Sequence, residues 1–423
     1  MARGRRRVAA RGLAVAVALT AGGCGPRGGG DGGGPGADAG DAGAGASDAS
    51  GDAASDAGAS ADAGSASWTC RETAAAGAPF GAPLLVSDPT HASFVPATAA
   101  HGARVLFAWH EFDAASVAHV VFSLAQEGCV GPITTLPDPY APARRPAVAA
   151  TTAGWVVAYE ASDGTTDVIR AFELDADGNV LAGPDTVSTP GLFGDWVDVD
   201  ARGDDEAFAW TDGSAHYFAM RGPRETVAAG LVGTTLVSTG LLNYPRIALA
   251  GDGTLHLAWR DGGVQAIDWD VLVVTRPAGG PFGAPVDVSQ SPGYGSDSMD
   301  AYVEGDGTLD LVWAEQDPAN VSAYEAAYAT RSAAGVWTAP ARYGPQGDQI
   351  WTPSVASGLA AVWNTNTAAA GPLYFASGPV PAALVFAGTS GRTPVLALSP
   401  DGTRHLVFAT PGPPAQIFYA WGY

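Results

Sequence analysis

Positive charge is scarce in this sequence of 423 residues. Lysine is absent, so all 21 basic residues are arginine, against 43 acidic residues, and the formal net charge is −22. A surface so acidic repels nucleic-acid phosphates and anionic lipid headgroups. The composition therefore argues against DNA or RNA as a partner, and against a membrane contact made by the protein surface itself.

Cysteine is scarce as well, with three residues in the whole chain, Cys24, Cys70 and Cys129. Cys24 belongs to an export signal described below. In an oxidising compartment the remaining even pair predicts a disulfide between Cys70 and Cys129. One pair of cysteines is too few for a structural zinc site, and the histidines show no ligand spacing, so we predict no metal centre from these residues.

Long apolar runs are missing except for Gly12 to Ala21, which follows an arginine-rich start. This run is too short for a permanent transmembrane helix and is typical of a signal peptide over residues 1–23. It ends in Ala21-Gly22-Gly23-Cys24, which resembles a bacterial lipobox. The resemblance implies cleavage before Cys24, acylation of its thiol, and a membrane contact through the lipid alone. Gly25 follows the cysteine in place of the aspartate that is linked to inner-membrane retention, so we expect the outer membrane. An ordinary secretory signal is the alternative.

Residues 24–67 consist almost wholly of glycine, alanine, serine and aspartate after the cysteine. Such a segment cannot bury enough apolar surface to offset its ordering entropy, so it predicts a disordered linker. The folded domain is therefore expected over residues 68–423.

A repeat of about 50 residues runs through that domain. Three copies show it best: Gly251-Asp-Gly-Thr-Leu-His-Leu-Ala-Trp259, its counterpart from Gly305 to Trp313, and its counterpart from Pro400 to Phe408. The aromatic residue that closes the motif recurs as Trp109, Tyr159, Trp210, Trp259, Trp313, Trp363 and Phe408. Seven units with room for four short strands predict an all-β, seven-bladed β-propeller. A β-sandwich or β-helix is the alternative.

The last unit, from Thr393 to Tyr423, has sequence for three strands only. Residues 79–87 repeat the outer-strand sequence Pro281-Phe-Gly-Ala-Pro285 with its following strand. We therefore expect the N-terminal strand to complete the last blade and close the ring, which removes an open sheet edge.

Two groups of side chains are expected on the top face, where the loops between blades and the loops between second and third strands meet. The acidic group follows the blade aromatics and comprises Glu111, Asp212, Asp261 and Glu315, with Glu160 one residue after Tyr159. The second group stands at the start of the blades and comprises Phe94, Arg144, Trp196, Tyr244, Arg246, Tyr294, Trp351 and Arg392. Aromatic rings with charged groups around a funnel suit sugar or peptide binding, although the same residues could merely solvate loops and plug the channel.

One segment resembles half of a calcium loop, with oxygen ligands at Asp175, Asp177 and Asn179. It lacks the closing glutamate, and Asp-Gly-Asn also forms a good turn by itself. Calcium is therefore a weak expectation, and no other cofactor is expected.

The ring as a whole resembles the sialidase-like propellers in its repeat texture. Their Asp-box motif is missing, because Ser162-Asp163-Gly164-Thr165 matches only part of it. The resemblance implies that their arginine triad would correspond to Arg144, Arg246 and Arg392. The favoured hypothesis is a monomeric, non-enzymatic module that binds a glycan or a peptide. The alternative is a glycan-processing hydrolase of sialidase-like fold, with two top-face carboxylates as its catalytic pair.

Overall fold

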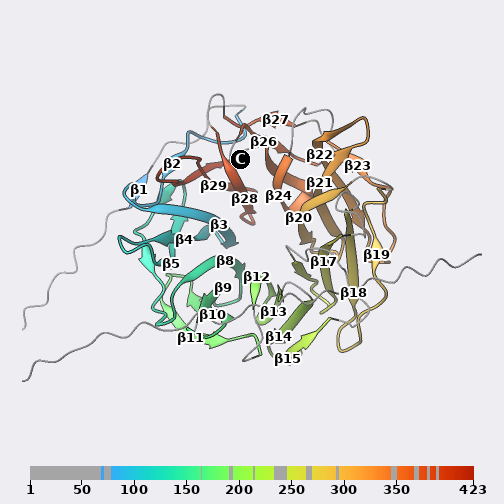
Figure 1. Ribbon diagram of the computed structural model, residues 1–423, viewed down its shortest axis with the longest axis horizontal. Helices are drawn as coiled ribbons and strands as arrows, with labels where there is room; N and C mark the ends of the chain where they lie inside the picture. Colours follow the sequence, from blue (N-terminus) through green and yellow to red (C-terminus); the bar gives the residue numbers. More distant parts are fainter. Residues whose placement is uncertain are drawn as a thin grey trace, which may run out of the picture. The chain divides into compact units, whose positions relative to one another are not determined.

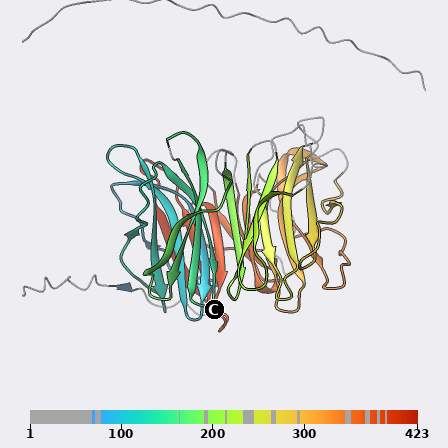
Figure 2. The ribbon, with the colours of Figure 1, turned by 90° about the horizontal axis from the view of Figure 1, so that it is seen from below.

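The strands of this protein form a ring of seven antiparallel sheets (Figure 1). The computed structural model describes residues 68–70, 78–162, 164–189, 194–212, 215–232, 245–262, 269–291, 295–343, 350–365, 371–378, 382–386 and 390–423. Seen from the side, the strands run along the axis of the ring (Figure 2). The fold is the seven-bladed β-propeller that the repeat predicted.

The blades follow one another along the chain, each from its innermost strand outwards. Blade 1 holds β3 (Ala92–His101), β4 (Arg104–Phe112), β5 (Ala118–Gln126), β6 (Cys129–Val130) and β7 (Thr134–Thr135). Blade 2 holds β8 (Ala143–Ala150), β9 (Gly154–Ser162), β10 (Asp167–Asp175) and β11 (Val180–Thr186). Blade 3 holds β12 (Asp195–Arg202), β13 (Asp205–Thr211), β14 (His216–Arg221) and β15 (Val227–Leu231). Blade 4 holds β16 (Arg246–Leu249), β17 (Leu255–Gly262), β18 (Trp269–Arg276) and β19 (Val286–Asp287).

The remaining blades repeat this order. Blade 5 holds β20 (Ser296–Val303), β21 (Leu309–Asp317), β22 (Asn320–Arg331) and β23 (Ala341–Arg342). Blade 6 holds β24 (Ile350–Ala356), β25 (Ala360–Thr365), β26 (Leu373–Ala376) and β27 (Ala383–Leu384), with the short 3-10 helix η1 (Ser357–Leu359). Blade 7 holds β28 (Arg392–Leu398), β29 (Arg404–Ala409), β30 (Ile417–Gly422) and β2 (Leu84–Leu85).

The core lies between neighbouring blades. The seven aromatic residues of the repeat are fully buried there, namely Trp109, Tyr159, Trp210, Trp259, Trp313, Trp363 and Phe408. Because each sheet packs against a sheet on both sides, its strands are apolar on both faces rather than alternating. Gly253, Gly307 and Gly402 turn the repeated hairpins at φ near 87°, a conformation that glycine adopts without a Cβ penalty.

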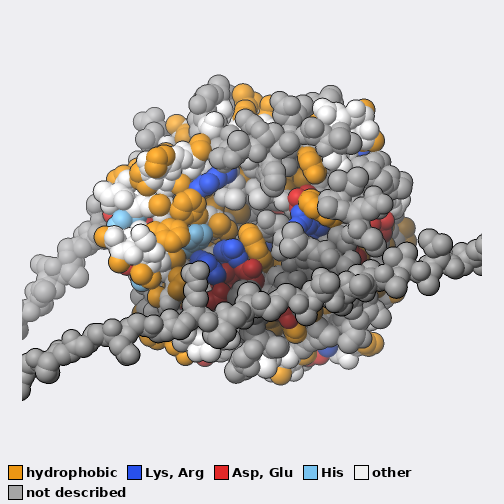
Figure 3. Space-filling model, in the orientation of Figure 1, with side chains coloured by type: hydrophobic (Ala, Val, Ile, Leu, Met, Phe, Trp, Pro, Cys, Tyr) orange, Lys and Arg blue, Asp and Glu red, His pale blue; other side chains and the backbone are white. Residues whose placement is uncertain are grey.

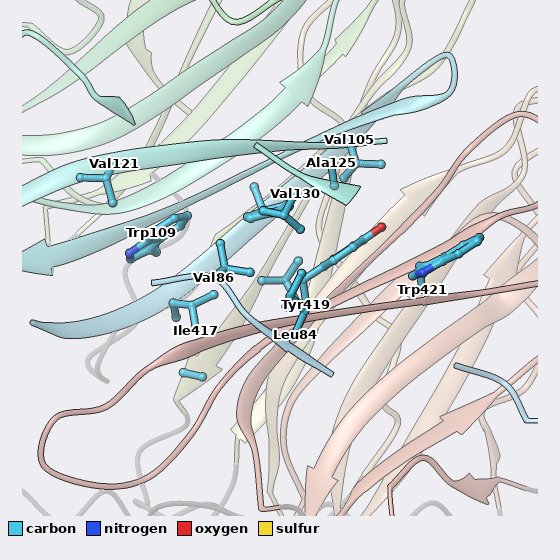
Figure 4. Packing of buried hydrophobic residues seen from close by; sticks show 13 residues of the cluster. Leu84, Val86, Val105, Trp109, Val121, Ala125, Val130, Ile417, Tyr419 and Trp421 are labelled. Atoms are coloured by element: carbon cyan, nitrogen blue, oxygen red, sulfur yellow. The ribbon is translucent and has the colours of Figure 1, made fainter. Parts of the chain in front are cut away.

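The ring closes as the sequence predicted. In β2, Leu84 pairs with Tyr419 and Leu85 with Phe418 of β30. Figure 4 shows Leu84 and Val86 packed among Ile417 and Tyr419 of blade 7 and side chains of blade 1. The N-terminal strand therefore joins the two ends of the ring through both backbone hydrogen bonds and a buried apolar cluster.

The predicted disulfide between Cys70 and Cys129 is present. It joins β6 to an additional strand, β1 (Thr69–Cys70), which pairs at the outer edge of blade 1. A two-residue strand has no periodicity, so its existence was not predictable from the pattern. Cys24 and the linker over 24–67 lie outside the described residues. Within the part of the chain that is described, no helix is long and apolar enough to cross a membrane.

Candidate functional site

Six blades share an irregularity near the top end of the innermost strand. One residue there has a positive φ, between 32° and 51°, and the pairing with the second strand shifts register around it. These residues are Val95, Arg145, Trp196, Ser298, Thr352 and Thr393. Such bulges re-aim side chains, and a positive φ outside glycine costs of order 1–3 kcal/mol, so it persists only where its surroundings enforce it. We call the end of the central channel framed by these bulges the channel mouth.

Arg145 and Trp196 lie together at the mouth, on blades 2 and 3. The guanidinium of Arg145 lies 4.1 Å from the centre of the Trp196 ring. Below this pair is Glu160, only 1% exposed, which accepts hydrogen bonds from Arg145 at 3.0 Å and from the Trp196 backbone N–H at 2.6 Å. Arg145 also pairs with Asp195. The buried Glu160 and the half-buried Asp195 thus hold the half-buried Arg145 and Trp196 in place.

The same glutamate binds a second arginine, Arg144. Its Nε donates to Glu160 Oε2 at 3.1 Å, and its Nη2 donates to Asp167 at 2.9 Å. Burial, followed by the hydrogen bond to Asp195, raises the pKa of Glu160 to about 8.

A second arginine–aromatic pair lies two blades further round the mouth, at blades 7 and 1. The guanidinium of Arg392 lies 4.7 Å from the ring centre of Phe94, which stacks on His110 at 5.6 Å. Among the described residues the guanidinium of Arg392 has no ion pair and no hydrogen bond. Burial, and then the charges of Arg145, Arg144 and Arg392, lower the pKa of His110 to about 4. Three arginines therefore act on His110 at the mouth of this strongly acidic protein.

Figure 3 shows arginine, histidine and acidic side chains gathered around the hollow at the centre of this face. Below the mouth the central channel encloses a cavity of about 410 Å³. A groove of about 770 Å³ adjoins the mouth at Phe94, running between blades 1 and 7 and lined by Phe112, His91 and Pro414 among others. The groove and the channel approach each other at the mouth, where they are lined by the neighbouring residues Phe94 and Val95.

The residues predicted at the start of the blades fall into different places in the structure, some at the channel mouth and one deeper in the channel. Phe94, Arg144, Trp196 and Arg392 lie at the mouth, as described above. Arg246 lies within the channel, where its Nε is 3.3 Å from Asp300 Oδ1. The three arginines of a sialidase-like triad therefore do not share one level of the channel. Tyr244 and Tyr294 lie outside the described residues, and Trp351 belongs to β24 by its backbone, which pairs with Asn364.

The predicted acidic group lies mostly inside the blades. Glu111 accepts hydrogen bonds from the Trp109 indole at 3.4 Å and from Ser93, and Glu315 accepts them from the Trp313 indole at 2.5 Å and from Ser296. Each glutamate thus ties its own blade together. Both are largely buried, at 9% and 3% exposure, so they present little surface to a ligand.

Asp212 and Asp261 stand at the same place in blades 3 and 4. Asp212 accepts a hydrogen bond from the Tyr217 hydroxyl at 2.7 Å. The buried Oδ1 of Asp261 has no hydrogen-bond partner in the part of the chain that the structure describes. Neither carboxylate converges with the arginines of the mouth in the contacts described.

The residues of the expected calcium loop form a turn after β10. Asp175 accepts hydrogen bonds from the backbone N–H groups of Asp177 and Asn179 at 2.9 and 2.8 Å, and Arg104 pairs with Asp177. The carboxylates are thus engaged by the chain itself. In the described residues no cluster of three or more His, Cys, Asp or Glu side chains could hold a metal ion.

Sequence reasoning missed Arg145, His110 and Asp195. Arg145 stands at the bulge position of blade 2, which Trp196 occupies in blade 3. In blades 1, 2 and 7 a proline follows this position, namely Pro96, Pro146 and Pro394, so an alignment of the blades at these prolines would have identified Arg145. His110 follows the blade aromatic by one residue and carried no separate signal.

No family model matches this chain, and no curated protein sequence matches it. Among solved structures, a PL25 ulvan lyase has 8% identity and a TM-score of 0.51 over 78% of this chain and 93% of its own. The same type of lyase bound to -[GlcA(1-4)Rha3S]- has 9% identity and a TM-score of 0.50 over 81% of this chain and 93% of its own.

A protein of unknown function from Dyadobacter fermentans has 9% identity and a TM-score of 0.50, over 80% of this chain and 97% of its own. At such identities the likeness establishes the propeller fold, and polysaccharide lyases are among the proteins that share it. The function has to be argued from the site.

Proposed function

We propose that this protein binds acidic glycans at the channel mouth. The observation that carries the proposal is the pair of arginine–aromatic contacts at the mouth, Arg145 on Trp196 and Arg392 on Phe94, which lie two blades apart around the ring. Flat rings stack on sugar rings, and guanidinium groups bind carboxylate or sulfate in a bidentate manner. The ulvan lyase of similar fold is bound to a glycan that carries both kinds of anion, which supports this ligand class.

Binding without turnover is the favoured form of the proposal. A glycosidase places two carboxyl groups on either side of the bond that it cleaves. Here the closest acidic pair at the mouth, Glu160 and Asp195, is covered by Arg145, and Glu160 is 1% exposed. An acid that sits beneath the binding surface positions arginine rather than protonating a leaving group.

A glycan-processing enzyme of sialidase-like or related fold is the second candidate. The observation in its favour is the raised pKa of Glu160, about 8, because a carboxyl group that is protonated at neutral pH can serve as a general acid. Release of reducing ends or of unsaturated sugars from any glycan that binds would establish this candidate in place of the first.

The proposed setting is the cell envelope. The lipobox-like sequence that ends in Cys24 supports export and acylation, with the outer membrane as the address and the linker over 24–67 as a tether. A monomer displayed in this way needs no membrane contact beyond its lipid.

The test is a glycan array that includes uronate-containing and sulfated chains, with peptides as the competing ligand class. Arg392→Ala should weaken binding of an acidic glycan roughly tenfold or more, since a hydrogen bond to a charged group contributes about 1.5–3 kcal/mol. Trp196→Ala should weaken it similarly. The control is Arg342→Ala, which removes one arginine from the rim of blade 5, where it pairs with Glu325.

The proposal also requires that affinity fall with added salt, because the attraction is partly ionic. Equal affinity of Arg392→Ala and Arg342→Ala would contradict it, as would exclusive binding of neutral glycans or of peptides.

A further inference from the structure

The wall of the central channel has two chemically different sides. Below Arg145, the lining from blades 1, 2, 6 and 7 is made of alanine, valine, leucine, proline, serine and threonine. Every charged residue that lines the channel below this level comes from blades 3 to 5, and these residues are Asp198, Asp200, Arg202, Arg246 and Asp300. A cavity of about 410 Å³ with an apolar side and a few converging polar groups has the size and character of a small-ligand site.

The carboxylates on the charged side join neighbouring blades. Asp198 Oδ2 accepts a hydrogen bond from the Ile247 backbone N–H at 2.8 Å, and Asp200 Oδ2 accepts one from Leu249 at 2.7 Å. The Oδ1 of Asp200 is also engaged, by the backbone N–H of Ala201 at 2.8 Å. The Oδ1 of Asp198 has no hydrogen-bond partner among the described residues. One of the two aspartates thus keeps a free acceptor atom while the other does not.

Arg246 lies on the same side of the channel as Asp198, and its charge acts on that carboxyl group. It enters from blade 4, and its Nε is 3.3 Å from Asp300 Oδ1 and donates to the Met299 carbonyl at 3.0 Å. Burial raises the pKa of Asp198 to about 7, whereas the charge of Arg246 opposes that rise. Carboxylate and guanidinium groups on one side of the channel supply both acceptors and donors, as recognition of hydroxyl groups requires.

The lower end of the channel is spanned by Arg202. From the end of β12 in blade 3, its guanidinium donates to the Val303 carbonyl of blade 5 at 2.6 Å and lies 5.5 Å from the centre of the Tyr302 ring. A ligand would therefore enter from the channel mouth, past Arg145 and Trp196.

We propose that the channel is a second subsite, which receives the terminal monosaccharide of a glycan bound at the mouth. The hydroxyl groups of that sugar donate to Asp198 Oδ1 and accept from Arg246, and its apolar face lies against the side lined by alanine. A sugar ring has the same division into polar edge and apolar face as the channel wall. The inference rests on the proposed function, because it assigns the end of the same ligand.

The experiment compares two matched variants on one strand. Asp198→Asn keeps an acceptor for the Ile247 N–H but replaces the free carboxylate oxygen by an NH₂ group. Asp200→Asn makes the same change where both oxygens are already engaged. The probes are glucuronic acid, galacturonic acid, glucose and galactose as free monosaccharides, measured by saturation-transfer NMR and titration, with thermal unfolding as the check on folding.

We expect at least one of these monosaccharides to bind the wild-type protein and to bind Asp198→Asn roughly tenfold more weakly, a loss of about 1.4 kcal/mol. Asp200→Asn should retain wild-type affinity even where it unfolds at a lower temperature. Arg392→Ala, which alters the mouth, should also retain monosaccharide binding while losing the acidic glycan.

Three outcomes separate the two proposals. If the acidic glycan binds but no monosaccharide does, or if Asp198→Asn and Asp200→Asn bind alike, the channel assignment is wrong and the mouth assignment stands. If neither glycan nor monosaccharide binds the wild-type protein, both are wrong. If a monosaccharide binds while Arg392→Ala leaves the acidic glycan unaffected, the channel assignment stands and the mouth assignment falls.

Discussion

At the scale of single residues, the blades place polar side chains at one repeated position deep in the core. His256, Asp310 and His405 each lie three residues before the blade aromatic and are at most 3% exposed. His405 is hydrogen-bonded within its own blade, to Ser399 Oγ and to the Tyr419 hydroxyl, both at 2.9 Å. This network fixes the neutral ring, because burial lowers the pKa of His405 to about 4.

His405 should therefore make folding sensitive to mild acid. Its folded pKa lies below the ordinary value of 6.5, so the unfolded chain takes up the proton first as the pH falls. The contribution to stability is complete above pH 6.5 and is lost between about 6.5 and 4, at no more than about 1.4 kcal/mol per pH unit for one histidine. Urea unfolding of His405→Gln between pH 7.5 and 5 should show a shallower pH dependence than wild type.

His119→Gln is the matched control for that measurement. The imidazole of His119 is 38% exposed and pairs with Asp113 on the surface, so its removal should leave the slope nearly unchanged. A slope in His405→Gln equal to that of the control would show that the buried ring does not remain neutral.

The candidate site was predictable in part, and the reason lies in the backbone. Phe94, Arg144, Trp196 and Arg392 could be placed at the mouth because each precedes or occupies the start of an innermost strand. When blades 3 and 4 are aligned, Arg246 stands two residues further along its innermost strand than Trp196 does. Arg246 therefore lies lower on the channel wall. Counting along a strand cannot locate a bulge, because the extra residue leaves the hydrophobic pattern on either side intact.

At the scale of elements, β2 is a short strand with a large structural role. Phe80, Leu84 and Val86 in and beside it are each at most 8% exposed. Phe80 packs edge-on against Phe375 of blade 6 with ring centres 5.4 Å apart, while Leu84 and Val86 join the cluster between blades 7 and 1. The closing segment therefore contacts three blades.

Deleting residues 68–90 should destabilise the ring strongly. Burial of each large apolar side chain contributes about 1.5–3 kcal/mol, so the loss amounts to several kcal/mol and to several degrees or more in Tm. A deletion of the same length within the linker, residues 44–66, is the control and should leave Tm unchanged. Cooperative melting of both variants at the wild-type temperature would refute closure by β2.

At the scale of the whole molecule, the number of blades was predictable because one buried aromatic marks each of them. The repeat did not predict the additional strand β1 of blade 1, and it did not predict that the channel has an apolar side and a charged side. The second property depends on which blades carry Asp198, Arg246 and Asp300 at one level. It becomes visible only once the blades are set in a ring.

Replacement of the proposed lipid attachment site tests the address of the molecule. Cys24→Ser should abolish labelling by a radioactive or alkyne-tagged fatty acid and move the protein from the membrane to the soluble fraction, because a lipid is its only proposed membrane contact. Cys70→Ser is the control, since it removes a cysteine without touching the signal. Detergent-dependent fractionation of Cys24→Ser would contradict lipid anchoring.

Closure by β2 also determines when folding can finish. The hydrogen bonds that close the ring include one between Ser87 and Ile417, which are 330 positions apart. The segment around β2 is synthesised first, but it can pair only after β30 has been synthesised. A chain that stops anywhere before β30 leaves the edges of β2 and of its final blade unpaired, and such edges invite proteolysis and aggregation. The ring thereby distinguishes complete chains from incomplete ones, because only a chain that includes β30 can pair both edges, and shortened products keep an edge open to proteases.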